Sequence, residues 1–282
     1  MKVGIIMGFT GPIESLTPTM ADSAELVFKE ASESGALLDG KKIEAVRADT
    51  TCVDAAVASS AAERLVTSEK VVAMVGAACS GSSTAIATKV AAANGVAMIS
   101  PSSTSPALTT VEDNGMFFRT APSDARQGEV LAGIVIDREI KEVAITYTNN
   151  DYGKGLAESF GNAYKAKGGK VAISAAHEDG KADYSAEVGA LSASGAEELV
   201  VLGYLDQGGR GVIQASLDAD AFSRFILADG MIGESLIKNV DGSLNGTFGT
   251  LPGSESAGAK MFLEHAKANG IDGDGPYRAE SY

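Results

Sequence analysis

Short apolar runs alternate with segments of helical periodicity along the whole 282-residue chain. The runs contain few polar positions, which is typical of strands buried on both faces of a parallel sheet. We predict strands at VGIIMGF (3–9), KIEAVRADT (42–50), VVAMVGA (71–77), VAMIS (96–100), VAITYTN (143–149), VAISAA (171–176), ELVVLGY (198–204) and RFILAD (224–229). Helical patterns lie at about 20–34, 54–68, 83–93, 124–139, 153–167, 184–194, 206–218 and 255–268. This order predicts an α/β fold with parallel sheets covered by helices.

The alternation is interrupted twice. FFRTAPSD (117–124) is typical of a strand that runs into a proline and a helix N-cap, and GTLPG (249–253) is a second break. After the first break the strand–helix pattern starts again. We therefore expect two Rossmann-like lobes, the first made of residues 1–121 and 252–282 and the second of residues 122–251.

Composition narrows the function classes. The formal net charge is −14, which argues against nucleic acid or an anionic membrane surface as a partner. No apolar run reaches 18 residues, and Met1-Lys2 leads directly into a strand, so neither a membrane span nor a signal peptide is visible. HExxH, Walker, GxGxxG and GxSxG motifs are absent, and His177 and His265 are expected at the surface. We predict no catalytic residue, cofactor or metal.

Ligands of parallel α/β sheets bind beyond the carboxyl ends of the strands. In the first lobe these ends carry hydroxyls before helices, CSGSST (79–84) and PSSTSP (101–106), which suit an anion. In the second lobe they carry Tyr152, Tyr204 and Asp229, which suit a cation with an apolar body. Together they predict a site for a zwitterion such as an amino acid. Hydroxyls before helices are more often plain N-caps, and Asp229-Gly230 is equally typical of a turn. Tyr152 and Tyr204 are also consistent with ordinary half-buried aromatic residues.

The chain has two cysteines, and each follows a predicted strand. Cys52 comes after residues 42–50 and Cys79 after residues 71–77. If those strands are neighbours, the two thiols lie at the same edge of the sheet and are close enough to bridge. Two free buried cysteines are the other reading of this spacing.

Several stretches make the chain resemble the leucine/isoleucine/valine-binding protein family, the periplasmic receptors of branched-chain amino acid ABC importers. They are MGFTGP (7–12), ADTTCVDAAVA (48–58), VGAACSGSSTAIA (75–87), MISPSSTSPALT (98–109), FFRTAPSD (117–124), NNDYGKGLAESF (149–160), DYSAEVGAL (183–191), GYLDQGG (203–209), FILADG (225–230) and GPYRAESY (275–282). The paired cysteines and the ISPxxTxPxLT stretch carry the most specific part of the likeness. It implies the type I periplasmic binding protein fold, with two hinged lobes and a ligand cleft between them.

The resemblance also implies site residues. Ser80 matches the serine that holds the ligand carboxylate, and Ser102, Ser103 and Thr104 match the turn that assists it. Tyr152 and Tyr204 match the family's two tyrosines, Asp229 matches the acidic residue that meets the ammonium group, and Tyr277 matches a pocket aromatic. The cysteine pair is a disulfide in the family, which implies a Cys52–Cys79 bridge.

The chain departs from the family in three respects. Ile13-Glu14-Ser15-Leu16 stands where relatives often have an aromatic residue, so the identity of the amino acid stays open. Asp229 is one methylene shorter than the usual glutamate. Family members continue past the position of Tyr282, so we expect the C-terminal part to be truncated and the first lobe to lack part of its core.

The resulting expectation is a monomeric solute-binding protein of the periplasm, free or lipid-anchored. It would bind an amino acid, most simply a branched-chain one, and deliver it to a membrane permease. The alternatives are the sensor domain of a signalling receptor and a receptor for small amides. Repressors with this fold need an N-terminal DNA-binding helix-turn-helix, but this chain begins on a strand. A hydrolase would need a base beside Ser80.

Overall fold

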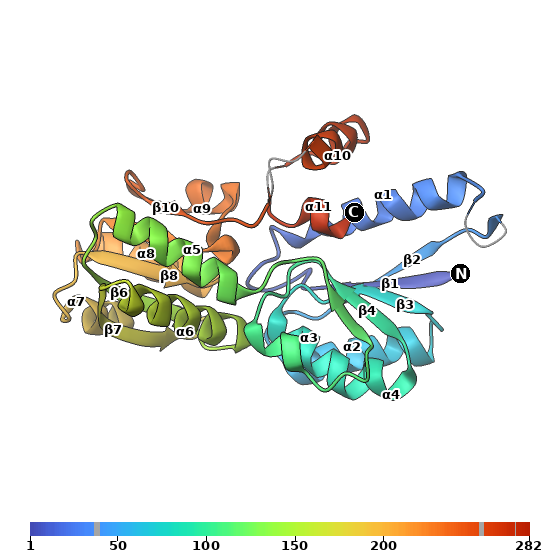
Figure 1. The fold of residues 1–282 in the computed structure, drawn as a ribbon, viewed down its shortest axis with the longest axis horizontal. Helices are drawn as coiled ribbons and strands as arrows, with labels where there is room; N and C mark the ends of the chain where they lie inside the picture. Colours follow the sequence, from blue (N-terminus) through green and yellow to red (C-terminus); the bar gives the residue numbers. More distant parts are fainter. Residues whose placement is uncertain (37–39, 254–256, 274) are drawn as a thin grey trace. The chain divides into compact units, whose positions relative to one another are not determined.

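The computed structural model describes residues 1–36, 40–253, 257–273 and 275–282, and it divides them into two compact units. Unit 1 consists of Met1–Thr104, Thr110–Ala121 and Gly253–Tyr282, and unit 2 of Ser105–Thr109 and Pro122–Pro252. Each unit contains a five-stranded sheet of parallel strands, with helices packed on the sheet (Figure 1). The predicted α/β fold with two parallel sheets is therefore confirmed.

The sheet of unit 1 has the strand order β2-β1-β3-β4-β5. Its strands are β1 (Lys2–Met7), β2 (Glu44–Asp49), β3 (Ala73–Gly76), β4 (Ala97–Ser100) and β5 (Phe117–Arg119). Because right-handed crossovers change face when the strand order changes direction, α1 (Thr17–Glu33) covers one face, and α2 (Ala55–Thr67) and α3 (Ser80–Ile86) cover the other. The order changes direction at β1 and β3, which places the loops after these strands at the sheet's switch point.

The two faces of this sheet are buried to different extents. On the α2/α3 face Ile6, Met74 and Met98 pack with Leu65 and Ile86 in one continuous core. On the opposite face burial falls toward β5, where the register partners Ile99 and Phe118 are 40% and 54% exposed. The described part of unit 1 therefore leaves apolar side chains uncovered on β4 and β5.

The helix that follows β3 begins earlier than the predicted position 83. Cys79 is extended, with φ −94° and ψ 138°, and serves as the N-cap, so Ser80 is the first residue of α3. The helical stretch continues as one π-helical turn (Ala87–Ala91) and then α4 (Ala92–Asn94), where Gly95 ends it in the left-handed conformation. The serine cluster thus forms the first turn of a helix and not a loop before it.

The sheet of unit 2 has the strand order β10-β9-β8-β6-β7. Its strands are β6 (Glu142–Thr148), β7 (Lys170–His177), β8 (Glu198–Leu202), β9 (Arg224–Leu227) and β10 (Phe248–Gly249). The short edge strand β10 was not predicted, because it falls at the start of the stretch interpreted as a break. The same crossover rule puts α6 (Asp151–Ala166) on one face and α7 (Ser185–Ser192) with α8 (Gly208–Asp218) on the other, and α5 (Asp124–Asp137) packs against α6.

The core of unit 2 depends on a close contact between α5 and α6. A Cβ atom on Gly128 of α5 would lie only 2.6 Å from the backbone nitrogen of Phe160, so a larger residue would push the helices apart. This contact brings the buried stripe of α6, Leu156, Phe160 and Tyr164, onto the sheet. The Tyr164 hydroxyl donates a hydrogen bond to the Ile140 carbonyl oxygen at 2.8 Å, which satisfies its polar end.

The remaining α-helices of the described residues are α9 (Glu234–Asn239) in unit 2, and α10 (Ala257–Ala268) and α11 (Arg278–Ser281) in unit 1. Short 3₁₀ helices lie at Pro106–Thr110 and Asp229–Met231. The helix predicted at 255–268 corresponds to α10, although its first two positions lie outside the described residues. None of the described helices is both long and apolar enough to cross a membrane.

Candidate functional site

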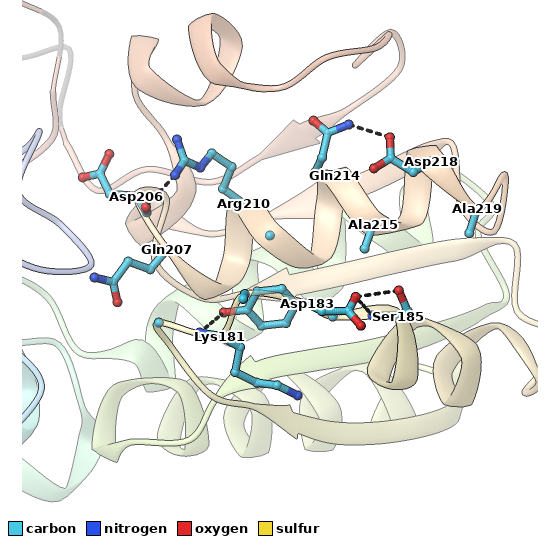
Figure 2. Close-up of a pocket in the computed structure, with 14 residues that line it drawn as sticks. Lys181, Asp183, Ser185, Asp206, Gln207, Arg210, Gln214, Ala215, Asp218 and Ala219 are labelled. Carbon is cyan, nitrogen blue, oxygen red and sulfur yellow. Dashed lines mark hydrogen bonds between the residues drawn. The ribbon is translucent and has the colours of Figure 1, made fainter.

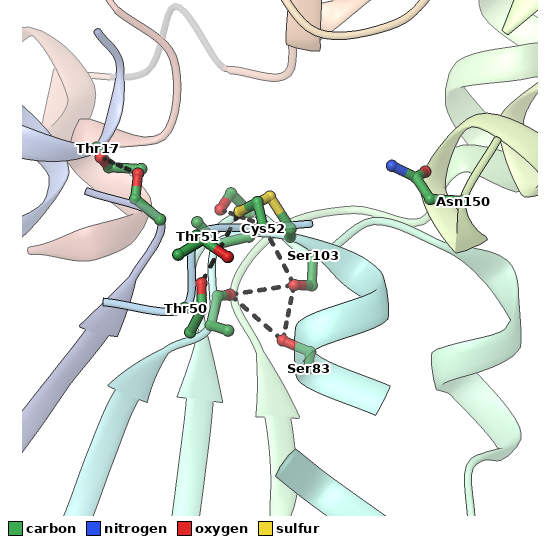
Figure 3. The surroundings of a disulfide bond; sticks show 12 residues. Thr17, Thr50, Thr51, Cys52, Ser83, Ser103 and Asn150 are labelled. Atoms are coloured by element: carbon green, nitrogen blue, oxygen red, sulfur yellow. Dashed lines mark hydrogen bonds between the residues drawn. A yellow bond between two sulfur atoms is a disulfide. The ribbon is translucent and has the colours of Figure 1, made fainter. Parts of the chain in front are cut away.

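Unit 1 gathers serine hydroxyls around two backbone carbonyls just after β3. The carbonyl oxygen of Ala77 accepts hydrogen bonds from Ser100 Oγ at 2.5 Å and from Ser103 Oγ at 3.1 Å. Ser102 Oγ donates to the next carbonyl, that of Ala78, at 2.9 Å. Ser83 Oγ lies 2.8 Å from Ser103 Oγ and closes the cluster (Figure 3). These side chains therefore hold the β3–α3 loop against the loop that follows β4. The hydroxyl of Ser103 already has its hydrogen-bond partners within the protein.

Two predicted residues of this unit have a different environment. Ser80 is buried at the N-terminus of α3, and the first N–H groups of a helix are a common place for an anion to bind. Thr104 is buried as well, and its Oγ1 has no hydrogen-bond partner among the described residues. A buried hydroxyl without a partner costs stability, which makes Thr104 a candidate for contact with a ligand.

A disulfide joins Cys52 to Cys79, the N-cap of α3, beside this cluster (Figure 3). Cys52 packs directly on Gly8, where a Cβ atom would lie 2.5 Å from its sulfur. The bridge therefore ties the loop after β2 to the first turn of α3, and Gly8 leaves the room that it needs. Tyr277, the remaining predicted residue of unit 1, lies immediately before α11 with its ring buried.

Unit 2 brings three predicted residues together at the ends of three strands. Tyr152 lies in the first turn of α6 after β6, Tyr204 in the turn after β8, and Asp229 directly after Ala228, which follows β9. The two tyrosine rings are stacked, with centroids 5.1 Å apart and an angle of 8° between their planes. The Tyr152 hydroxyl donates to Asp229 Oδ1 at 2.9 Å and accepts from the backbone N–H of Gly230 at 3.2 Å.

Burial and negative charge both shape this tyrosine site. Burial raises the pKa of Tyr152 and of Tyr204 well above the usual tyrosine value. The carboxylate of Asp229 adds to the rise for Tyr152, and the carboxylates of Asp179 and then Asp229 add to it for Tyr204. The hydroxyls therefore stay protonated and can act as hydrogen-bond donors. A buried carboxylate beside two aromatic faces is suited to binding a cation.

Sequence reasoning missed a second carboxylate in this place. Asp124, in the first turn of α5, is fully buried, and its charge also raises the pKa of both Tyr152 and Tyr204. The sequence suggested only an N-cap in this stretch. The cap is Ser123 and not Asp124, since the Ser123 hydroxyl accepts a hydrogen bond from the backbone N–H of Ala125 at 3.3 Å. The signal in the sequence was one acidic residue directly after the cap, and hydrophobic periodicity alone does not mark such a residue as part of a site.

The prediction that His177 lies at the surface is wrong. It is the last residue of β7 and is 1% exposed, and its Nδ1 lies 2.8 Å from Thr146 Oγ1. Burial lowers the pKa of this imidazole to about 4, although the charge of Glu187 opposes that shift. The polar sequence after it (Glu178-Asp179-Gly180) suggested a solvated turn, whereas parallel pairing with β6 draws the strand's last residue into the interior. His265 on α10 is exposed, as predicted, and contacts Glu30.

Comparison with known proteins identifies the family. A family model described as periplasmic binding protein matches residues 1–272. The chain belongs to the periplasmic binding protein family. The resemblance stated from the sequence motifs is thereby confirmed.

Several curated relatives and solved structures match almost the entire chain. An amino acid binding protein of Pseudomonas aeruginosa is 30% identical over 99% of this chain and 75% of its own length. A leucine-, isoleucine-, valine-, threonine- and alanine-binding protein of the same organism is 29% identical over 100% of this chain and 75% of its own. The leucine binding protein LivK of Thermotoga maritima has a TM-score of 0.85 at 25% identity, covering 100% of this chain and 79% of that one. LivJ of Streptococcus pneumoniae, in complex with isoleucine, has a TM-score of 0.84 at 27% identity, covering 100% and 80%.

A separate surface groove of this periplasmic binding protein lies in unit 2 and has a volume of about 560 Å³. Its walls come from α8 and from the segment before α7 (Figure 2). Arg210 Nη2 donates to the Asp206 carbonyl oxygen at 3.0 Å, and Gln214 Nε2 donates to Asp218 Oδ1 at 2.8 Å. Many of its polar groups thus bond to one another. None of the predicted site residues lines the groove, so it is not part of the tyrosine site.

Proposed function

We propose that this chain is an extracytoplasmic solute-binding protein that binds a free amino acid and delivers it to the permease of an ABC importer. The observation that carries the proposal is the stacked pair of Tyr152 and Tyr204 with the Asp229 carboxylate hydrogen-bonded to Tyr152. This arrangement offers charge and hydroxyl groups to an ammonium group and flat apolar surface to the atoms beside it. Asp124 supplies a second negative charge to the same end of the ligand.

Unit 1 is proposed to bind the opposite end of the same ligand. Ser80 and Thr104, together with the N–H groups at the start of α3, offer donors to a carboxylate. Ser102 and Ser103 act behind them, because their hydroxyls hold the carbonyls of Ala77 and Ala78. Tyr277 is proposed to give the ligand side chain an apolar wall.

The relatives indicate the class of side chain. Proteins named for binding leucine, isoleucine, valine, threonine and alanine match this chain over nearly its whole length, and one similar structure holds isoleucine. A small or branched aliphatic amino acid is therefore the proposed ligand. We further propose that the protein acts as a monomer without enzymatic activity. Its disulfide supports a location outside the cytoplasm, since such bridges persist in oxidising compartments.

The proposal is tested by screening the protein for ligands after unfolding and refolding, which removes any ligand carried from expression. At 100 times the dissociation constant a bound amino acid stabilises the protein by about 2.7 kcal/mol and raises its melting temperature by roughly 5 °C. We expect this rise with L-leucine, L-isoleucine or L-valine and no rise with their D-enantiomers. If none of the twenty amino acids shifts the melting temperature or gives heat in calorimetry, the proposed function is wrong.

Thr104→Val and Ser103→Ala form a matched pair that separates binding from folding on the unit 1 side. Thr104→Val removes a buried hydroxyl without a described partner, so we expect unchanged or slightly higher stability but weaker amino acid binding. Ser103→Ala breaks hydrogen bonds to Ser83 and Ala77, so we expect the free energy of unfolding to fall by about 1 kcal/mol or more. Urea denaturation and calorimetry measure the two quantities, and the reverse pattern would contradict these roles.

A further inference from the structure

His177 lies directly behind the turn that carries Tyr204. A Cβ atom on Gly203 would lie 2.9 Å from His177 Nε2, and one on Gly208 would lie 2.8 Å from its Cδ2, so the imidazole fills the space against both glycines. These glycines flank Tyr204 on either side of the turn between β8 and α8. The position of the ring therefore limits where the turn, and with it Tyr204, can lie.

The same turn is fixed to the rest of the tyrosine site. The backbone N–H of Leu205 donates to the Gly230 carbonyl oxygen at 3.0 Å, which joins the Tyr204 turn to the turn that begins at Asp229. Gly230 has no room for a side chain, since a Cβ atom there would lie 2.6 Å from the Gly203 carbonyl oxygen. A shift at Gly203 would therefore reach both Tyr204 and the Asp229 turn.

The polar atoms of His177 are unequally satisfied. Nδ1 is hydrogen-bonded to Thr146, but Nε2 is buried and has no hydrogen-bond partner among the described residues. The hydrogen bond to Thr146 accounts for one ring nitrogen, but nothing in the fold of the described residues accounts for the buried polar atom Nε2. The unsatisfied nitrogen faces Gly203, and a proton on both nitrogens would place a charge against the backbone of the turn.

We propose that His177 is a positioning residue of the tyrosine site: the neutral imidazole holds the Tyr204 turn in its binding position, and protonation of His177 disengages the turn and weakens amino acid binding. The inference rests on the proposed function for its effect on affinity, but the coupling between His177 and Tyr204 is a property of the ligand-free protein. Tyr204 touches the ligand in this scheme, whereas His177 acts only through the turn.

The surroundings of His177 set the direction of the pH effect. Glu187 on α7 favours the proton, Asp179 approaches Gly208 from the segment after β7, and Tyr184 meets the imidazole edge-on with centroids 6.5 Å apart. Burial outweighs Glu187, so the folded-state pKa, about 4, lies below the ordinary histidine value. At pH values above the ordinary histidine pKa, the contribution of the neutral ring to folding stability is fully present. It is lost as the pH falls toward 4. Tyr184 also lines the surface groove described above.

The first test uses the ligand-free protein and needs no amino acid. Carbon-13-labelled histidine gives two signals, and a His265→Gln variant leaves only that of His177. The chain has no tryptophan, so near-ultraviolet circular dichroism reports mainly on tyrosine. We expect the His177 signal and the tyrosine dichroism to change with one midpoint near pH 4, and we expect His177→Gln to lack the dichroism change. A His177 titration that leaves the dichroism of the folded protein unchanged would overturn the proposal.

The second test measures L-leucine affinity from pH 7 to pH 3.5 for wild type, His177→Gln and the His265→Gln control. If only the neutral form binds, the wild-type dissociation constant, relative to that of His177→Gln, rises about two-fold at the His177 midpoint. Dividing by the dissociation constant of the variant removes the pH effects that the two proteins share, and the His265→Gln control should follow wild type. Parallel profiles for wild type and His177→Gln would overturn the proposal. Absence of L-leucine binding at pH 7 would count against the branched-chain ligand proposed here, and the first test would still decide the role of His177.

Discussion

Asp229→Asn is expected to weaken amino acid binding by about 3 kcal/mol or more, which raises the dissociation constant by more than about 100-fold. The reason is that an ammonium group removed from water loses its buried counter-charge. Asparagine keeps an oxygen that can accept from the Tyr152 hydroxyl, so the tyrosine pair should stay stacked. Isothermal titration calorimetry with the best ligand from the screen measures the change.

Glu158→Gln provides the matched control for that experiment. It removes the same charge from the same unit, but Glu158 is an exposed residue of α6. We expect its affinity to equal that of wild type. If Asp229→Asn and Glu158→Gln bind equally well, Asp229 does not meet the ligand, and Asp124→Asn becomes the variant that identifies the buried counter-charge.

Removal of the disulfide by Cys52→Ala with Cys79→Ala is expected to destabilise unit 1 by about 3.5 kcal/mol. The bridge closes a loop with a sequence separation of 27 residues. The estimate is the free energy that corresponds to the conformational entropy which the unfolded chain regains when this loop is opened. It should be measured by scanning calorimetry, where the transition of unit 1 falls by roughly 10 °C.

Unit 2 serves as the internal control for the disulfide experiment, because both cysteines belong to unit 1. Most tyrosines lie in unit 2, so loss of the tyrosine dichroism marks the unfolding of that unit. The melting temperature of that transition should change less than the melting temperature of unit 1. Wild type in reducing agent should behave as the double variant does. Equal stability of the double variant and the oxidised wild type would mean that the bridge does not constrain the unfolded chain.

Local pattern was sufficient to predict most of the fold. Strands such as β8 (Glu198–Leu202) are apolar at nearly every position, and helices such as α5 begin at a serine cap, so both are encoded within a few residues. The failures occur where tertiary contacts decide. The strand β10 has only two residues and exists through pairing with β9, and the start of α3 depends on the extended Cys79.

The candidate site was predictable in part for the same reason. Ser80, Tyr152, Tyr204 and Asp229 follow strand ends, and the strand order brings such ends to one edge of each sheet. Asp124 and His177 could not be recognised, because their meaning comes from burial and not from the neighbouring sequence. Ser103 was predicted as a ligand residue like Thr104, but only the structure shows that its hydroxyl bonds to Ser83 and Ala77.

The sequence by itself determined the alternating α/β architecture, the motifs of the family and the strand ends after which hydroxyls, tyrosines and one carboxylate follow. These are local properties, since apolar periodicity and capping act over a few neighbouring residues. Only the tertiary structure decided that Tyr152 stacks on Tyr204 and that Asp229 accepts a hydrogen bond from Tyr152, 77 positions away in the sequence. It also decided that His177 is buried as a neutral imidazole behind the Tyr204 turn. Such contacts depend on strand order and on exclusion of water, and neither is encoded in a short stretch of chain.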